Sequence, residues 1–144
     1  GPGQYPEKLI PKFIVHSLIG IPHTIHGKGQ YSRSFIYVTD TVNAIYCLYK
    51  RGKIGEVYNI GSEDEFTPIY ISKVVGEMRG VEPSVVFIED RPYNDERYNI
   101  SCEKLKSLGW VRLVPFADGL MKTFEWYEEN LYFVTTKMID NGDL

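Results

Sequence analysis

Two hydrophobic periods alternate along this chain. Apolar residues at helical spacing predict helices over residues 6–19, 41–51, 67–79, 101–108 and 115–131. Between them, short runs rich in β-branched and aromatic residues predict strands at residues 23–26, 34–38, 56–60 and 85–88. Because helices and strands alternate, the pattern predicts an α/β or α+β fold.

Several boundaries carry recognisable capping residues. Asp40 has the position of an N-cap for the helix over residues 41–51. Thr67 precedes Pro68, which combines a capping hydroxyl with proline at the first helical position. Ser101 is placed to cap the short helix that follows it. The polar residues 135–144 predict a frayed tail, so we expect one domain over residues 1–134.

The predicted strands need more cover than this chain supplies. Several are apolar on both faces, which is typical of strands covered on both sides. In addition, the motif-rich segment Gly1–Pro11 stands at the first residues of the chain. We therefore expect a neighbouring domain that lies outside this sequence.

Composition narrows the classes of partner. The chain has 144 residues, 43% of them hydrophobic, eleven Tyr, and a net charge of −3, which argues against a nucleic-acid backbone as ligand. No apolar run reaches the ~18 residues of a membrane span. The two cysteines, Cys47 and Cys102, lack metal-ligand spacing and fall in predicted helices. We expect buried free thiols in a reducing compartment, and so a cytoplasmic protein.

Two segments could bind phosphate. Glu7 and Lys8 lie in the first turn of a predicted helix, where unpaired N–H groups favour an anion and Lys8 adds a charge. The alternative is a solvated helix start. Further on, a glycine-flanked turn at residues 27–29 precedes Arg33 at a strand edge, a residue type that binds phosphate through paired donors. Here the alternative is a hairpin turn with a surface arginine.

Two other segments are less decisive. The loop over residues 90–98 contains Arg91 and Arg97, acidic residues and two tyrosines. These side chains either bind a ligand or form an ion-pair cluster on the surface. Asn59 lies at a predicted strand end, where its side chain can bond the backbone of the next turn. We interpret Asn59 as structural.

The residues by themselves indicate no reaction. The sequence has no glycine-rich dinucleotide fingerprint after a strand, no Gly-x-Ser-x-Gly and no Walker loop, and we also expect no Tyr-x-x-x-Lys pair. His16, His23 and His26 have no metal-ligand partners in the sequence pattern, so we predict no metal site. The residues predict at most a phosphorylated ligand.

Taken in order, the motifs resemble a known family. They are Pro6-Glu7-Lys8-Leu9-Ile10-Pro11, Gly27-Lys28-Gly29, Arg33-Ser34-Phe35-Ile36-Tyr37-Val38-x-Asp40, Tyr58-Asn59-Ile60-Gly61, Asp90-Arg91-Pro92-x-x-Asp95-x-Arg97-Tyr98, Leu108-Gly109-Trp110 and Glu125-Trp126-Tyr127. Together they closely resemble the C-terminal half of the dTDP-glucose 4,6-dehydratases, NAD-dependent members of the extended short-chain dehydrogenase/reductase superfamily. The resemblance implies the substrate-binding part of a Rossmann-type enzyme and extends to about Asn130.

The resemblance also implies which residues bind the nucleotide sugar. They are Lys8 and Leu9 beside the sugar nucleotide, Thr24, Ile25 and His26 along the nucleotide, Arg33 on the diphosphate, and Asp90, Arg91 and Asn94 in the loop that supplies a second phosphate-binding arginine. The family usually has Tyr where this chain has His26. Many members place a substrate-binding Asn where this chain has Pro68, so that contact is not carried over. Asp40 is given a structural role.

In this family, NAD oxidises the sugar at C4, water is lost across C5–C6, and the hydride returns to C6. The resemblance places the NAD-binding and catalytic residues in the N-terminal half, so we expect no catalytic residue in this chain and no activity from it alone. It implies dTDP-glucose or UDP-glucose as ligand and a homodimeric full-length enzyme. The alternatives are an epimerase or decarboxylase of the same superfamily, or a non-catalytic sugar-nucleotide-binding module.

Overall fold

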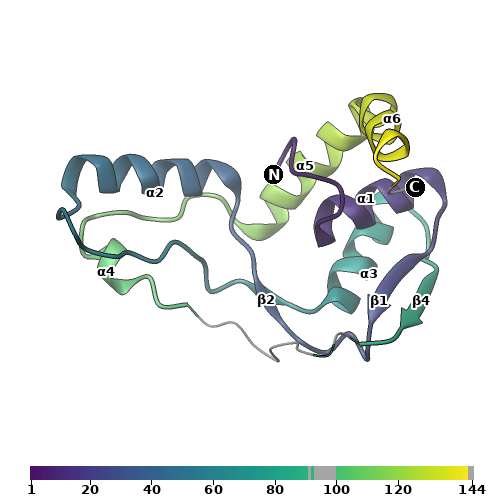
Figure 1. Ribbon diagram of the computed structural model, residues 1–144, viewed down its shortest axis with the longest axis horizontal. Helices are drawn as coiled ribbons and strands as arrows, with labels where there is room; N and C mark the ends of the chain where they lie inside the picture. Colours follow the sequence, from purple (N-terminus) through teal and green to yellow (C-terminus); the bar gives the residue numbers. More distant parts are fainter. Residues whose placement is uncertain (91, 93–99, 143–144) are drawn as a thin grey trace.

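The computed structural model describes the chain except for residues 91, 93–99 and 143–144. Figure 1 shows an elongated molecule, with a group of helices beside a strand pair at one end and an arm carrying α2 and α4 at the other. We call residues 38–64 and 100–114 the arm. The elements are α1 Leu9–Ile19, β1 His23–His26, β2 Arg33–Ser34, α2 Val38–Arg51, β3 Glu65–Phe66, α3 Pro68–Arg79, β4 Val85–Ile88, α4 Glu103–Lys106, α5 Phe116–Glu129 and α6 Leu131–Asp140.

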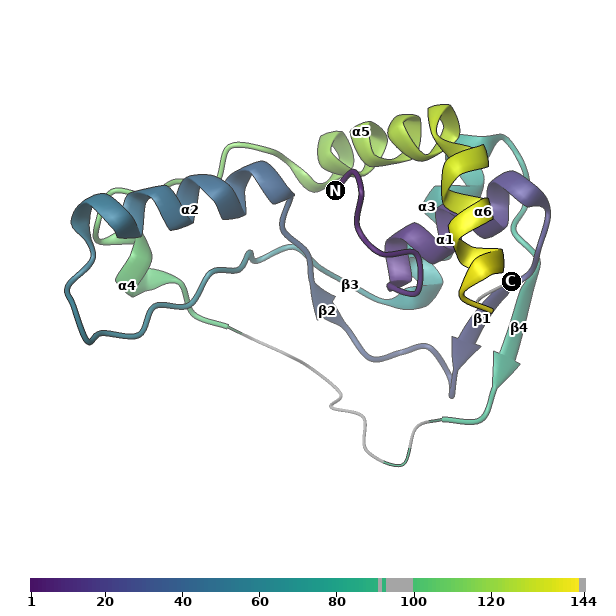
Figure 2. The ribbon, with the colours of Figure 1, turned by 45° about the horizontal axis from the view of Figure 1, so that its top comes forward.

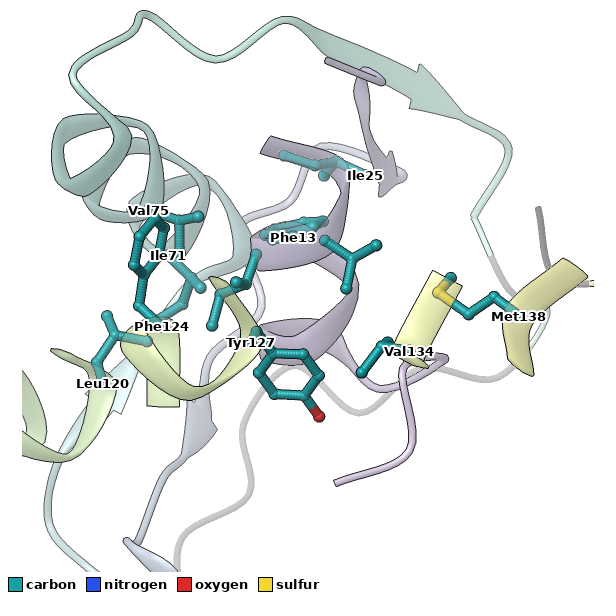
Figure 3. Close-up of a cluster of buried hydrophobic side chains, with 11 residues drawn as sticks. Phe13, Ile25, Ile71, Val75, Leu120, Phe124, Tyr127, Val134 and Met138 are labelled. Carbon is teal, nitrogen blue, oxygen red and sulfur yellow. The ribbon is translucent and has the colours of Figure 1, made fainter. Parts of the chain in front are cut away.

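Helix α1 lies at the centre of the main hydrophobic cluster. Its Phe13, Ile14 and Val15 are completely buried, and the helix packs against α3, α5, α6 and β1. In Figure 3, Phe13 lies near Ile25 of β1, while side chains from α3, α5 and α6 surround the same helix. Full burial of each large apolar side chain stabilises the fold by about 1.5–3 kcal/mol.

The strands form two small pairs. β1 runs parallel to β4 with His23 opposite Val85, and β2 runs antiparallel to β3 with Arg33 opposite Phe66. The predictions of strands at residues 23–26 and 85–88 are confirmed. The strand predicted at residues 34–38 is wrong beyond Ser34, because Val38 already begins α2, and residues 56–60 are not a strand. Apolar β-rich composition alone does not provide the strand partner that a ladder needs.

Asp40 has a different structural position from the predicted N-cap. Helix α2 begins at Val38, so Asp40 lies within its first turn and is completely buried. Its two carboxylate oxygens accept hydrogen bonds from the backbone N–H groups of Leu113 (3.0 Å) and Val114 (2.9 Å). The indole of Trp110 donates to the Asp40 carbonyl at 3.2 Å. Asp40 thus holds α2 against the irregular segment, including Leu113 and Val114, that leads into α5.

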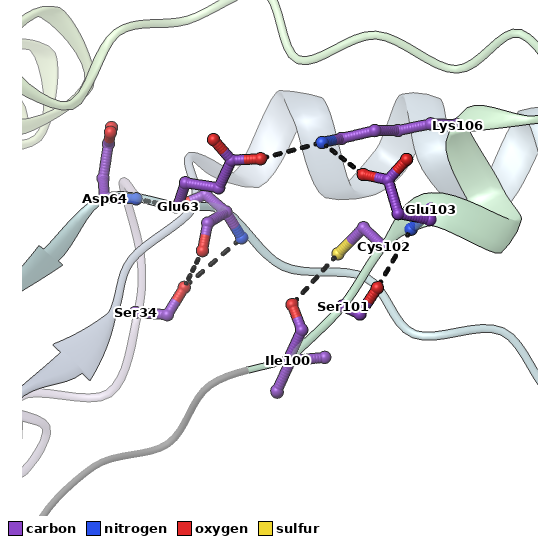
Figure 4. A network of polar contacts seen from close by, with 9 residues as sticks. Ser34, Glu63, Asp64, Ile100, Ser101, Cys102, Glu103 and Lys106 are labelled. Carbon is purple, nitrogen blue, oxygen red and sulfur yellow. Dashed lines mark hydrogen bonds and ion pairs between the residues drawn. The ribbon is translucent and has the colours of Figure 1, made fainter.

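A second polar network joins α4 to the residues before β3. Lys106 forms ion pairs with Glu63 (2.8 Å) and Glu103 (2.9 Å), and these carboxylates hold the pKa of Lys106 above its ordinary value. Nearby, the Ser34 hydroxyl donates to the Ser62 carbonyl at 2.6 Å (Figure 4). The short helix begins at Glu103, and Ser101 accepts only a long 3.5 Å bond from its N–H, so the cap predicted at Ser101 is a weak one.

The end of the chain differs from the predicted frayed tail. Residues up to Asp140 form α6, in which Val134 is 5% and Met138 is 2% exposed. These two apolar side chains at helical spacing face the main cluster, and the polar character of residues 135–144 hides that pattern in the sequence.

The hydroxyl of Tyr127 in α5 donates to the Gln4 carbonyl, and burial raises the pKa of Tyr127 to about 12. The first residues are therefore fastened to α5.

One helix face has no cover among the described residues. Val42, Ile45, Tyr46 and Tyr49 of α2 are all more than half exposed, and Tyr49 reaches 79%. In both ribbon views α2 lies on the outside of the arm (Figures 1 and 2). Apolar residues on an outer helix face are typical of surfaces that contact other polypeptide.

The buried carboxylate of Asp40 allows a stability test. Asp40→Ala leaves the N–H groups of Leu113 and Val114 without their acceptors, and we expect it to lower the free energy of unfolding by about 2–4 kcal/mol. Asp118→Ala, at an exposed position in the first turn of α5, is the matched control and should cost about 0.3–1 kcal/mol. Urea unfolding measures both, and equal losses would contradict the role given to Asp40.

Candidate functional site

A cavity of about 520 Å³ lies between the start of α1, the strand β1 and the strand β2. It is lined by most of the residues that the sequence analysis assigns to ligand binding, namely Lys8, Leu9, Thr24, Ile25, His26 and Arg33. A larger cavity of about 570 Å³, between Gly61 and Arg112, contains none of them. The site therefore combines residues from segments that the sequence analysis had connected only through the family resemblance.

Local structure explains how α1 and β1 meet at this cavity. Helix α1 ends at Gly20, whose φ of +75° is a left-handed conformation that favours glycine, and its N–H bonds the His16 carbonyl. The chain then turns back into β1, where His23 and Ile25 are buried and Thr24 and His26 are partly exposed. The alternation of a strand thus buries His23 and Ile25 in the core and leaves Thr24 and His26 partly exposed at the cavity, which Ile25 also lines.

The charged groups of the cavity are mostly cationic. Lys8 at the N-cap of α1 is joined by Lys12 one turn later and by Arg33 from β2. The carboxylate in the lining is Glu7, which forms an ion pair with Lys8. This charge distribution, at the N-terminal end of an 11-residue helix, favours an anionic ligand.

Arg33 is held beside aromatic and backbone groups. Its guanidinium lies 5.3 Å from the ring centre of Tyr31 and donates to the Ser32 carbonyl at 2.8 Å. Tyr31 in turn donates its hydroxyl to the His26 carbonyl at 3.2 Å. A cation over an aromatic ring is attracted by the ring quadrupole. Tyr31 therefore links the position of Arg33 to the end of β1.

His26 has one ring nitrogen committed to the backbone. Its Nδ1 lies 3.1 Å from the Glu89 carbonyl, and because a carbonyl only accepts, Nδ1 carries a proton. The ring is partly exposed at the cavity. A fixed aromatic ring of this kind offers a flat surface on which a base can stack.

The loop after β4 is described only in part. Asp90 lies against the turn after β1, since a Cβ at Gly27 would come within 2.4 Å of the Asp90 carboxylate; Gly27 also has φ +55°. Asp90 is thus near the cavity but does not line it. Arg91 and Asn94 lie outside the described residues, and the diphosphate clamp between Arg33 and Arg91 stays a prediction.

Sequence reasoning missed some of the lining. Lys12 and Phe13 follow Lys8 and Leu9 by one helical turn, so the helical period could have placed them on the same face. Tyr31 also lines the cavity, and no local pattern indicates that. Pro68, from which no contact was expected, lies in the lining as the first residue of α3.

Other predicted residues lie elsewhere. Asn59 donates to the Ser101 carbonyl at 3.3 Å rather than to the turn that follows it. The expectation of no Tyr-x-x-x-Lys spacing is wrong, because Tyr46 with Lys50 and Tyr49 with Lys53 both have it. Lys50 lies 5.6 Å from the Tyr46 ring centre, and Tyr46 and Tyr49 are 61% and 79% exposed, so both tyrosines lie on a surface and outside the cavity.

Three structural findings concern metal binding, membrane-spanning helices and the cysteines. Within the described part of the chain, no group of His, Cys, Asp or Glu side chains could hold a metal ion. Over the same residues, every helix is too short or too polar to cross a membrane. Cys47 and Cys102 are both free thiols, half-buried and buried respectively.

Comparison with known proteins shows which proteins this chain is similar to. Residues 1–61 match the model of the NAD dependent epimerase/dehydratase family. The dTDP-D-glucose 4,6-dehydratase of Homo sapiens is 42% identical over 139 residues, which are 92% of this chain and 40% of that protein. A trifunctional UDP-glucose 4,6-dehydratase/epimerase/reductase of Arabidopsis thaliana is 42% identical over 132 residues, 90% of this chain and 20% of that protein.

A solved structure agrees with these relatives. The dTDP-glucose 4,6-dehydratase of Streptomyces venezuelae, solved with NAD and TYD bound, has a TM-score of 0.88 and 35% sequence identity. The match covers 92% of this chain and 42% of that one. The chain thus has an α/β fold similar to that of this dehydratase, and its first 61 residues match the NAD dependent epimerase/dehydratase family. It spans about 40% of the length of the dTDP-glucose 4,6-dehydratases that it matches, and 20% of the trifunctional protein.

Lys12 provides the first test of the cavity. Lys12→Ala removes one of the cations that line it, and we expect the affinity for a nucleoside diphosphate to fall about three- to five-fold, as for an exposed ion pair. The loss should shrink as salt rises. Lys73→Ala, on the exposed side of α3, is the matched control. Calorimetric titration measures both, and a Lys73→Ala loss as large as that of Lys12→Ala would contradict the assignment.

Proposed function

We propose that this chain is the C-terminal, nucleotide-sugar-binding part of an NAD-dependent nucleotide-diphosphate-glucose 4,6-dehydratase. The observation that carries the proposal is the cavity at the start of α1, where Lys8, Lys12 and Arg33 meet the strand residues Thr24 and His26. An anion-binding group of cations beside a strand and an aromatic ring fits a ligand that is half diphosphate and half base. The 4,6-dehydratase relatives support the same conclusion.

In this proposal each group of residues has one part to play. Arg33 binds the diphosphate with its paired donors, assisted by the charges of Lys8 and Lys12. His26 stacks on the base, and Thr24 and Ile25 border it. Leu9 provides an apolar contact at the sugar. Arg91, with Asp90 and Asn94 in the same loop, contributes the second phosphate contact that the family resemblance implies.

NAD belongs to the proposed full-length enzyme rather than to this chain. Neither the sequence nor the described residues contain a glycine-rich strand–turn–helix that would hold the cofactor's pyrophosphate. We therefore assign NAD binding mainly to the part of the relatives that this chain does not span. When bound there, NAD supplies the hydride acceptor and donor for the reaction, while this chain binds and orients the sugar nucleotide.

The uncovered face of α2 is consistent with such a partial chain. We propose that Val42, Ile45 and Tyr49 contact other parts of the complete enzyme. From the resemblance we also propose a homodimer whose contacts lie mainly outside this chain. The free thiols Cys47 and Cys102 support a cytoplasmic location, since a reducing compartment keeps thiols unpaired.

Arg33 gives the direct binding test. We expect Arg33→Ala in the complete protein to weaken binding of dTDP-glucose or UDP-glucose by about 1.5–3 kcal/mol, the value of a charged hydrogen bond, which is about ten- to 150-fold. Arg33→Lys should restore part of this loss, since it keeps the charge without the paired donors. Arg79→Ala, an exposed position at the end of α3, is the control. Calorimetry with both sugar nucleotides also reveals which base is preferred, and unchanged affinity in Arg33→Ala would refute the site.

A second test concerns activity. We expect the 144-residue chain by itself to form no 4-keto-6-deoxy sugar from dTDP-glucose or UDP-glucose in the presence of NAD, and the complete protein to form it. Product analysis by mass spectrometry checks both. Because the matching family model covers epimerases as well as dehydratases, a C4-epimerised sugar from the complete protein would favour the epimerase alternative. Binding with no turnover at all would favour a binding module.

A further inference from the structure

His23 lies in a buried polar bridge behind the candidate cavity. The residue is the first of β1 and is 1% exposed. Its Nδ1 lies 2.7 Å from the Ser72 hydroxyl on α3, and its Nε2 lies 3.0 Å from the Ser17 hydroxyl on α1. One imidazole thus joins the strand that borders the cavity to the two helices beside it.

The same ring also touches the cavity lining. Phe13 stacks on His23 with 4.4 Å between ring centres and 2° between ring planes, and Phe13 lines the cavity. The residues that follow His23 in β1, from Thr24 to His26, line it as well. A displacement of the His23 ring would therefore reach the cavity through Phe13 and through the strand itself.

Hydrogen-bond chemistry makes this bridge specific for the neutral ring. A neutral imidazole has one donor and one acceptor nitrogen, so one serine hydroxyl can accept from it while the other donates to it. A protonated imidazole donates from both nitrogens, and the hydroxyl that donated to the ring must turn away. The side-chain atoms that contact the ring nitrogens are both neutral hydroxyl oxygens, which compensate a buried positive charge poorly. The Phe13 backbone also hydrogen-bonds the ring and favours its protonated form, but this contribution is smaller than the cost of burial.

Titratable and charged groups near His23 come from α1, from α3 and from the segment before β4. His16 on α1 lies 6.5 Å from His23 between ring centres, and its Nδ1 lies 2.9 Å from the Pro22 carbonyl. Arg79 at the end of α3 and Glu82 before β4 line the neighbouring cavity of about 480 Å³. Burial, and secondarily the charge of His16, lowers the pKa of His23 to about 4, although a backbone hydrogen bond opposes this shift.

We propose that His23 is a positioning residue of the nucleotide-sugar cavity, and that acidification weakens ligand binding by protonating it and loosening the contact of β1 with α1 and α3. This inference rests on the function proposed above for the cavity. It adds a pH dependence that comes from a residue behind the site, with no contact to the ligand required.

The sign of the effect follows from linkage. His23 takes up protons more readily in a loosened state, near its ordinary pKa of ~6.5, than in the tight state, near pH 4. The stabilisation that His23 gives to the tight state is therefore fully present above pH 6.5 and is lost as the pH falls toward 4. Between pH 7.5 and pH 5 the ratio of tight to loosened molecules falls by up to about 30-fold for this pair of pKa values.

The test is the pH profile of binding to the complete protein, with UDP-glucose or dTDP-glucose as the probe, since neither diphosphate titrates in this range. Calorimetry of the unaltered protein should show affinity falling about three- to 30-fold from pH 7.5 to pH 5. In His23→Gln, whose amide offers one donor and one acceptor at every pH, the fall should disappear while affinity at pH 7.5 stays within about three-fold. His16→Gln and His26→Gln should each keep a fall with pH.

Every outcome decides between the proposals. No binding at pH 7.5 by the unaltered protein refutes the function proposed for the cavity. Three results overturn the role of His23 and leave the proposed function standing. They are normal binding with a flat pH profile, a fall in affinity that persists in His23→Gln, and a fall that vanishes in His26→Gln. If His23→Gln does not fold, NMR titration of the His23 ring in the unaltered protein, with and without UDP-glucose, replaces it. Bound ligand should lower the titration midpoint of His23, and the same midpoint in both states would overturn the inference.

Discussion

The packing of helix α1 is the interaction on which the rest of this structure depends. Phe13, Ile14 and Val15 have no exposed surface, and the helix touches α3, α5, α6 and β1. A helix buried on so many sides cannot move without disturbing each of these neighbours. Its first turn carries Lys8, Leu9 and Lys12 into the cavity. The candidate binding site is therefore built on the most rigidly packed element of the molecule.

The arm depends on a different kind of interaction. Its hydrophobic cluster is small, with Ala44, Cys102, Leu105 and Trp110 as buried members. Polar contacts supplement it: the Asp40 carboxylate on two backbone N–H groups, the ion pairs of Lys106, and the ion pair of Arg112 with Asp64. The exposed pairs contribute little by themselves, whereas the buried carboxylate leaves backbone groups unpaired if it is lost. The end of the molecule around α1 is thus stabilised mainly by apolar packing, whereas the arm depends more on polar contacts.

The sequence predicted α1 to α5, though not α6, and it predicted the strands less well, for a physical reason. A helix bonds within itself, so period and caps suffice, as at Thr67, which accepts from the Tyr70 N–H at 3.2 Å. A strand needs a partner, and nothing local shows that residues 65–66 rather than 56–60 pair with β2. Likewise, the helical period could have added Lys12 to the site, while Tyr31 lies in the irregular segment before β2, where no period indicates its contact with Arg33. The bridge at His23 joins residues 49 positions apart and could not be predicted from spacing.

The alternation along β1 has a consequence for how the site can change. His23 and Ile25 are buried, while Thr24 and His26 are partly exposed. Substitutions at residues 24 and 26 can alter the lining of the proposed ligand cavity with little effect on the core, and the cations of the cavity come from α1 and β2 instead. Recognition of one half of a bipartite ligand can therefore diverge while recognition of the other half is retained. Because of this alternation, substitutions in a four-residue strand could give related proteins different ligand preferences while the rest of the fold stays the same.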